Sequence, residues 1–114
     1  MNDVKADYDT DAPVFIEDET EYESITSEGV VLVDFYADWC GPCKMLEPIV
    51  ERLAAETDAT IAKVDVDSHQ ELAIEYRIQG VPTMFLYVDG EPVKRIVGLR
   101  GEHELRELIE QYTG

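Results

Sequence analysis

The chain contains two cysteines, Cys40 and Cys43, and only two residues separate them. On a helix, residues three apart share a face, with Cβ atoms about 5–6 Å apart. A disulfide needs a Cβ separation of about 3.5–4.5 Å. A small adjustment would therefore convert the two thiols into a disulfide and back. Because a crosslink over so short a loop stabilises little, the pair is interpreted as a reversible redox switch.

A carboxylate precedes the cysteines within an apolar run. Asp34 interrupts residues 30–36, which are otherwise β-branched, aliphatic or aromatic. Such a run is typical of a strand covered on both faces. An unpaired carboxylate there would be costly or would hold its proton. Two interpretations stay open: Asp34 handles a proton, or it reaches water at the strand end or caps the next turn.

The remaining candidate ligands indicate no second site. His69 and His103 lie at expected helix starts among polar neighbours, which is ordinary surface placement. A single Cys-x-x-Cys lacks the other ligands of a closed zinc site. Gly80 and Gly98 belong to no phosphate-binding pattern. We therefore expect neither a metal nor a nucleotide.

The charge balance excludes two classes of partner. Lys and Arg number 9 against 26 Asp and Glu, a formal net charge of -17. Nucleic acids and anionic membranes both need clustered basic residues, so neither is expected as a partner. The acidity has two explanations: a host with a salty cytoplasm, or merely an acidic tail. Acids also recur in the expected helices, for example Glu47, Glu51 and Glu107, which favours salt adaptation.

The length of 114 residues suits one compact domain. Residues 1–12 are rich in Asp and lack apolar periodicity, so we expect a mobile acidic leader followed by a single domain over 13–114. The opening is acidic rather than basic and apolar, and no stretch approaches membrane-spanning length. These features predict a cytoplasmic protein. In a reducing compartment, a close cysteine pair is more often catalytic or metal-binding than structural.

Apolar periodicity predicts the elements that must position these groups. Strands are expected over 13–17 at an edge, 30–36, 60–66, 83–88 and 93–97, the last two joined by a tight turn at Asp89-Gly90. A short helix is expected after Asp18, its N-cap, and a longer one from Cys43, with Pro42 in its first turn and Pro48 bending it. A third helix is expected after the capping box of Ser68 and Glu71, and a fourth over residues 102–111.

The inward positions of these helices follow from their spacing. They are Tyr22 and Ile25; then Met45, Leu46, Ile49, Val50, Leu53 and Ala54; then Leu72, Ala73 and Tyr76; and finally Leu105, Leu108, Ile109 and Tyr112. The resulting order, β-α-β-α-β-α-β-β-α, predicts an α/β fold: a mixed sheet of about five strands with four helices on its two faces. The cysteines would lie just past the carboxyl end of the second strand, where open α/β sheets commonly hold their sites.

At this point the residues resemble a known family. The segment from Val33 to Met45, with Trp39-Cys40-Gly41-Pro42-Cys43 at its centre, is similar to the active-site segment of the thioredoxin family. The resemblance covers roughly residues 13–112 and implies the thioredoxin fold. Outside the segment it rests on Pro48, Lys63, Val81-Pro82-Thr83, Gly90 and Gly98. The sequence departs from the family at Tyr36, where a tryptophan is frequent.

The resemblance implies a role for each matched residue. Cys40 would be the nucleophile and should be reachable, whereas Cys43 would be the shielded resolving thiol. Asp34 would accept the proton of Cys43, and Lys63 would tune its pKa. Pro82 would follow a cis peptide bond, although base rates alone favour trans. Gly41 and Pro42 would set the stiffness of the ring, and the substrate-binding residues would be Trp39, Val81, Thr83 and Gly98. Without the resemblance, Trp39 has two interpretations: an exposed rim that docks partners, or a side chain that fills the core.

The implied activity is the reduction of protein disulfides by dithiol-disulfide exchange. The partners would be protein disulfides and thioredoxin reductase, and no cofactor is implied beyond the Cys40–Cys43 disulfide. We expect a monomer, because negative charge repels copies of the chain. Two rival interpretations stay open. One is an isomerase or oxidase with the same site; the other is a redox-inactive interaction subunit, or a module whose cysteines share a metal.

Overall fold

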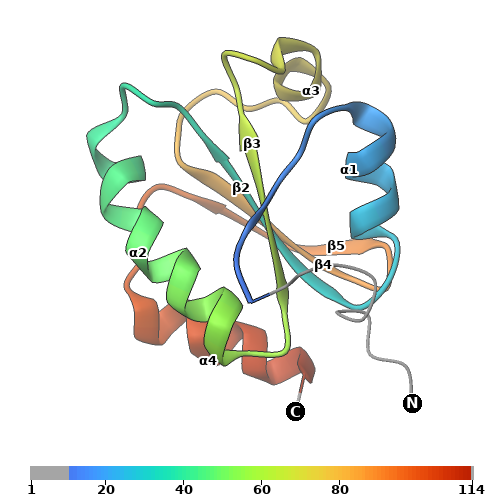
Figure 1. The fold of residues 1–114 in the computed structure, drawn as a ribbon, viewed down its shortest axis with the longest axis vertical. Coiled ribbons are helices and arrows are strands. Elements are labelled where there is room, and N and C mark those ends of the chain that lie inside the picture. Colours follow the sequence, from blue (N-terminus) through green and yellow to red (C-terminus); the bar gives the residue numbers. More distant parts are fainter. Residues whose placement is uncertain (1–10, 114) are drawn as a thin grey trace.

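The computed structural model describes residues 11–113 as one three-layer α/β domain (Figure 1). Along the chain the elements are β1 (Val14–Phe15), α1 (Glu19–Thr26), β2 (Val30–Tyr36), α2 (Gly41–Glu56), β3 (Thr60–Asp65), α3 (Gln70–Glu75), β4 (Thr83–Val88), β5 (Glu91–Val97) and α4 (Glu102–Thr113). The expected order and fold class are confirmed. Most of the predicted acidic leader, residues 1–10, lies outside the described residues.

The five strands form one mixed sheet in the order β1-β3-β2-β4-β5. β3 lies between β1 and β2 and is parallel to both, because helices connect these strands. β4 runs antiparallel to β2 and to β5, and Asp89-Gly90 closes the β4–β5 hairpin with positive φ at both residues. The two edge strands are β1 and β5, as the proline positions in the sequence predicted.

Each face of the sheet packs against two helices (Figure 1). On one face, α2 and α4 bury a cluster that includes Leu46, Leu53 and Ile109. On the other face, Tyr22 of α1 and Leu72 of α3 pack into a second, more aromatic cluster. Both clusters remove apolar surface from water, which stabilises the three layers together. No helix within residues 11–113 is long and apolar enough to cross a membrane.

The central strand β2 is covered on both faces. Val31, Val33 and Phe35 belong to the cluster under α1 and α3, and Leu32 belongs to the cluster under α2 and α4. Because strand side chains alternate, Asp34 shares the face of Leu32. The fold therefore places this carboxylate under the helix that carries Cys43.

Three local predictions are wrong. Met45 and Tyr112 were expected inward but are 62% and 42% exposed, since each lies at the edge of its helix's apolar stripe. The expected capping box does not form: α3 begins at Gln70, and its N-cap, His69, makes no side-chain cap hydrogen bond. Asp65 stabilises this turn instead, because its carboxylate accepts from the backbone N–H groups of Asp67 and Ser68.

Candidate functional site

The cysteine pair occupies the first turn of α2, just beyond the end of β2. Cys40 is the N-cap residue, with φ -91° and ψ 116°, and it is joined to Cys43 by a disulfide with a Cα–Cα distance of 5.2 Å. The backbone N–H of Cys43 donates to Cys40 Sγ at 3.1 Å. This N–H group has no carbonyl partner inside the helix, and both it and the positive end of the helix dipole favour negative charge on the Cys40 sulfur. The fold therefore places the start of α2 and one N–H donor at the Cys40 sulfur.

The expected contrast in exposure between the two cysteines is not found. Cys40 is 4% exposed and Cys43 is 2% exposed, so both are buried in the disulfide form. The reason is local packing: the pair forms a cluster with Tyr36 and Ala37, and Val81 packs against it. What small exposure remains is greater at Cys40.

The Val81–Pro82 segment forms a turn beside the cysteines. The Val81–Pro82 peptide bond is cis, and the Val81 carbonyl oxygen lies 3.5 Å from Cys40 Sγ. The N–H of Gly98, whose φ is +95°, donates to the Pro82 carbonyl at 2.8 Å. Thr83 is only 1% exposed, and its hydroxyl donates to the Gly80 carbonyl at 2.6 Å. The Thr83 side chain therefore holds the turn in place and presents no surface to a visiting protein.

An exposed rim lies beside the disulfide. Gly41 and Pro42 are both exposed, and a Cβ at Gly41 would meet no atom within 4 Å. Trp39 is 71% exposed, so it belongs to this rim and does not fill the core. Its indole Nε1–H donates to Asp67 Oδ2 at 2.9 Å, which fixes the ring despite its exposure. Sequence analysis missed Asp67, because this contact joins two segments far apart in the chain.

Asp34 is the buried ionisable group of the site. It is 1% exposed, and among residues 11–113 neither carboxylate oxygen has a hydrogen-bond partner. Burial raises the pKa of Asp34 from its ordinary value of 3.8 to about 7, while Lys63 opposes the rise and Glu47 adds to it. Asp34 does not reach water or cap a turn. It is poised to bind or release a proton near neutral pH.

Two side chains from neighbouring elements act on that carboxyl. Lys63 is the register partner of Asp34 on β3 and is itself only 5% exposed. Glu47 lies on the exposed side of α2, and its charge raises the pKa of Asp34. The resemblance identified Lys63, whereas Glu47 was missed because it follows the ordinary pattern of an exposed helix face.

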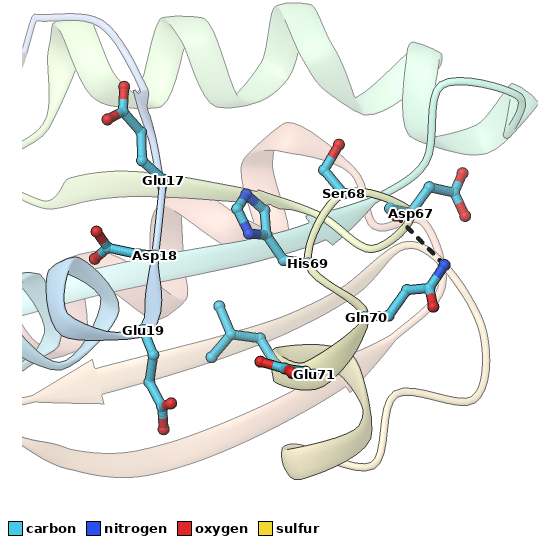
Figure 2. Close-up of a pocket in the computed structure, with 9 residues that line it drawn as sticks. Glu17, Asp18, Glu19, Asp67, Ser68, His69, Gln70 and Glu71 are labelled. Atoms are coloured by element: carbon cyan, nitrogen blue, oxygen red, sulfur yellow. Dashed lines mark hydrogen bonds between the residues drawn. The ribbon is translucent and has the colours of Figure 1, made fainter.

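A separate hollow lies away from the cysteines. It has a volume of about 430 Å³, and Figure 2 shows that its lining comes from Glu17 and Asp18 before α1, from Glu19 at the start of α1, and from Asp67 to Glu71 around the start of α3. His69 lines this hollow and His103 is exposed on α4, so neither histidine joins the cysteine site. Within residues 11–113, no group of three or more His, Cys, Asp or Glu side chains is arranged to hold a metal ion.

Comparison with known proteins gives consistent matches. The family model described as Thioredoxin matches residues 13–111. A thioredoxin of Mycobacterium tuberculosis is 52% identical over 87 residues, covering 74% of this chain and 75% of that protein. A thioredoxin of Chlamydia caviae is 44% identical over 93 residues, covering 81% and 91%. The solved structure of a mutant thioredoxin from Halobacterium salinarum superposes with a TM-score of 0.88 at 55% identity, covering 92% of this chain and 94% of that one.

Proposed function

The chain belongs to the thioredoxin family and is a dithiol-disulfide oxidoreductase, and we propose that Cys40 is its attacking thiolate and Cys43 its resolving thiol. One observation carries this assignment of roles. The Cys40 sulfur caps α2 and accepts the N–H of Cys43, whereas Cys43 lies within the first turn of the helix. Helix-start electrostatics therefore favour negative charge on Cys40.

The proposed exchange has two steps. The Cys40 thiolate attacks a partner disulfide; one sulfur–sulfur bond forms, the partner's bond breaks, and one partner thiolate leaves. The Cys43 thiolate then attacks the Cys40 sulfur, which closes the Cys40–Cys43 disulfide and releases the second partner thiolate. Two electrons pass from the chain to the partner. The two partner thiolates each take up a proton, so the balance closes with a reduced partner and an oxidised chain.

Asp34 is proposed to accept the proton of Cys43 before the second step. Its support is a pKa of about 7, set by burial, against an ordinary thiol pKa of about 8.5. A base poised near the working pH is the most effective, because enough of it is ionised and it still binds a proton. Lys63 is proposed to keep this pKa from rising further.

Protein disulfides and a thioredoxin reductase are the general partners of this family, and we propose both for this chain. The direction of transfer is proposed to be reduction, because Gly41-Pro42 lies within the ring as in reductants of the family. Val81, Trp39 and Gly98 are proposed to form the contact surface around Cys40, where an extended segment of the partner adds along the backbone. A strongly oxidising reduction potential would instead favour the isomerase or oxidase alternative.

A trapping experiment tests the assignment of the two cysteines. In a Cys43→Ser variant the first step proceeds and the second cannot, so partners should accumulate as mixed disulfides on Cys40. Dithiothreitol should release them, and mass spectrometry should map each link to Cys40. The matched control is the Cys40→Ser, Cys43→Ser double variant, which should capture nothing. Equal capture by that control, or links at no cysteine, would contradict the assignment.

The acidic surface is proposed to be an adaptation to a cytoplasm with high salt. The net charge is -17, and one similar structure comes from Halobacterium salinarum, a halophile. Screening shortens the range of charge repulsion to about 3 Å at 1 M salt. The described surface has few compensating ion pairs, notably Arg52 and Arg106 with Glu102, and surface pairs of this kind each contribute only about 0–1 kcal/mol. We also propose a monomer, because the same charge opposes self-association.

This proposal predicts that the melting temperature rises by several degrees between 0.1 M and 2 M KCl, because relief of repulsion outweighs the loss of a few exposed ion pairs. Calorimetry at fixed pH measures the slope. A variant in which Glu51, Glu71 and Glu110, all exposed, are replaced by Gln should melt higher at 0.1 M and depend less on KCl. A melting temperature that does not rise with KCl, or a variant with the same slope, would count against salt adaptation.

A further inference from the structure

Lys63 carries a buried positive charge that contacts aromatic rings. Its side chain is 5% exposed, and Nζ lies 4.3 Å from the centroid of the Tyr36 ring and 5.4 Å from that of the Phe15 ring. The two rings also meet edge to face, with centroids 6.4 Å apart. Within residues 11–113, no carboxylate oxygen lies within ion-pair distance of Lys63, and the oxygens of Asp34 have no hydrogen-bond partner. Ring faces therefore contact this ammonium, and no carboxylate does.

The two rings come from strands on either side of Lys63. Tyr36 follows Asp34 by two residues on β2, so both side chains lie on one face of the sheet. Phe15 is the register partner of Lys63 on the edge strand β1. Phe15 is 58% exposed while Lys63 is nearly fully buried, so the Phe15 ring forms the outer wall of the lysine's site. The face of an aromatic ring attracts a cation, most strongly where water is excluded.

We propose that Phe15 and Tyr36 are positioning residues: their ring faces hold the Lys63 ammonium beside Asp34, shield it from water, and thereby set how readily Asp34 takes up a proton. This inference rests on the proposed role of Asp34 as proton acceptor. The pair of rings belongs to this chain in particular: Tyr36 stands where a tryptophan is frequent in the family, and Phe15 lies on the two-residue edge strand β1.

The other charged groups around this site are acidic. Glu47 of α2 acts on both Asp34 and Tyr36, and Asp65 of β3 and Asp38 after β2 act on Tyr36. From β4, the register partner of Asp34 is the apolar Met84. Without the two rings, the Lys63 ammonium would be drawn toward water and toward Asp65. Asp65 lies on the same face of β3 as Lys63 and is more exposed than Lys63. Attraction between Lys63 and Asp34 would weaken, so the proton affinity of Asp34 would rise.

The test replaces the outer ring without removing its apolar volume. In the full chain, Phe15→Leu keeps an apolar side chain at this position but lacks a ring face, whereas Phe15→Tyr keeps the face. Carbon-13 NMR of the Asp34 carboxyl measures its titration, and the pH profile of disulfide reduction is recorded in parallel. We expect the Asp34 midpoint to move up by about half a pH unit in Phe15→Leu and to stay unchanged in Phe15→Tyr. Tyr112→Leu, an exposed aromatic of α4, is the matched control and should shift nothing.

The outcomes separate this inference from the role of Asp34. A second pair, Tyr36→Leu and Tyr36→Phe, should repeat the pattern at the inner ring. An unchanged or lowered Asp34 midpoint in both Leu variants would overturn the inference. A raised midpoint with an unmoved pH profile of turnover would leave the positioning of Lys63 in place and would instead overturn Asp34 as the proton acceptor.

Discussion

A Cys40→Ser variant is expected to lose disulfide reduction down to the background of the assay, a fall of at least about a thousandfold. A serine hydroxyl is not ionised near neutral pH, and the helix start that stabilises a thiolate at this position cannot make it an effective nucleophile toward a disulfide. Reduction of an insoluble or dye-labelled protein disulfide, with the chain regenerated by dithiothreitol or reductase, measures the loss.

The fold should survive this substitution. The disulfide closes a very short loop, so its removal changes stability little, and circular dichroism and melting of the reduced proteins should agree. Cys43→Ser is the matched variant: it also loses turnover but should still form a mixed disulfide with one equivalent of substrate. Full activity in Cys40→Ser would rule out the two-cysteine exchange, whereas single-turnover bonding by Cys40→Ser and not by Cys43→Ser would reverse the assigned roles.

Asp34→Asn is expected to slow disulfide reduction at pH 7 by at least about tenfold, because the amide cannot accept the proton of Cys43. The defect should shrink as pH rises through about 8.5, where an ordinary thiol ionises without help. Steady-state rates from pH 6 to pH 9 measure the profile. An unchanged rate with an unchanged profile would leave Asp34 a purely structural residue.

The same substitution is expected to stabilise the oxidised protein at pH 8 by about 4 kcal/mol. The pKa of Asp34 is raised from 3.8 in the unfolded chain to about 7 in the folded protein, so folding favours the protonated acid. Burial of Asp34 therefore costs the wild type least below pH 3.8, and the free energy of unfolding falls as the pH rises toward 7. Asparagine stays neutral and does not suffer this loss.

Urea unfolding of both proteins at several pH values between 4 and 8 tests the linkage. The difference in unfolding free energy should grow from near zero at the acid end to its full value at pH 8. A matched substitution at an exposed acid, Glu71→Gln, should change stability little at any of these pH values. Equal stability of Asp34→Asn and wild type at pH 8 would mean that the carboxylate is not desolvated in the folded protein.

Local patterns in the sequence were enough to predict the strands and helices and to single out the cysteine pair and Asp34. Alternating and continuous apolar runs specified strands such as residues 30–36, because a strand covered on both faces must be apolar throughout. The spacing of Cys40 and Cys43 indicated a redox pair, because residues three apart come close together once the segment turns into a helix. Asp34 was conspicuous for the same reason: a charge inside such a run has no local partner.

The surroundings of those groups depend on contacts that form when the whole chain folds. Contacts such as Trp39 to Asp67, or Lys63 to the rings of Phe15 and Tyr36, join segments that are distant in sequence, and no periodicity encodes them. The burial of Cys40 was mispredicted because the chain near it does not reveal that Val81 packs against it. Local sequence fixes which face of an element is apolar, whereas the exposure and pKa of a site residue depend on what the rest of the fold brings against it.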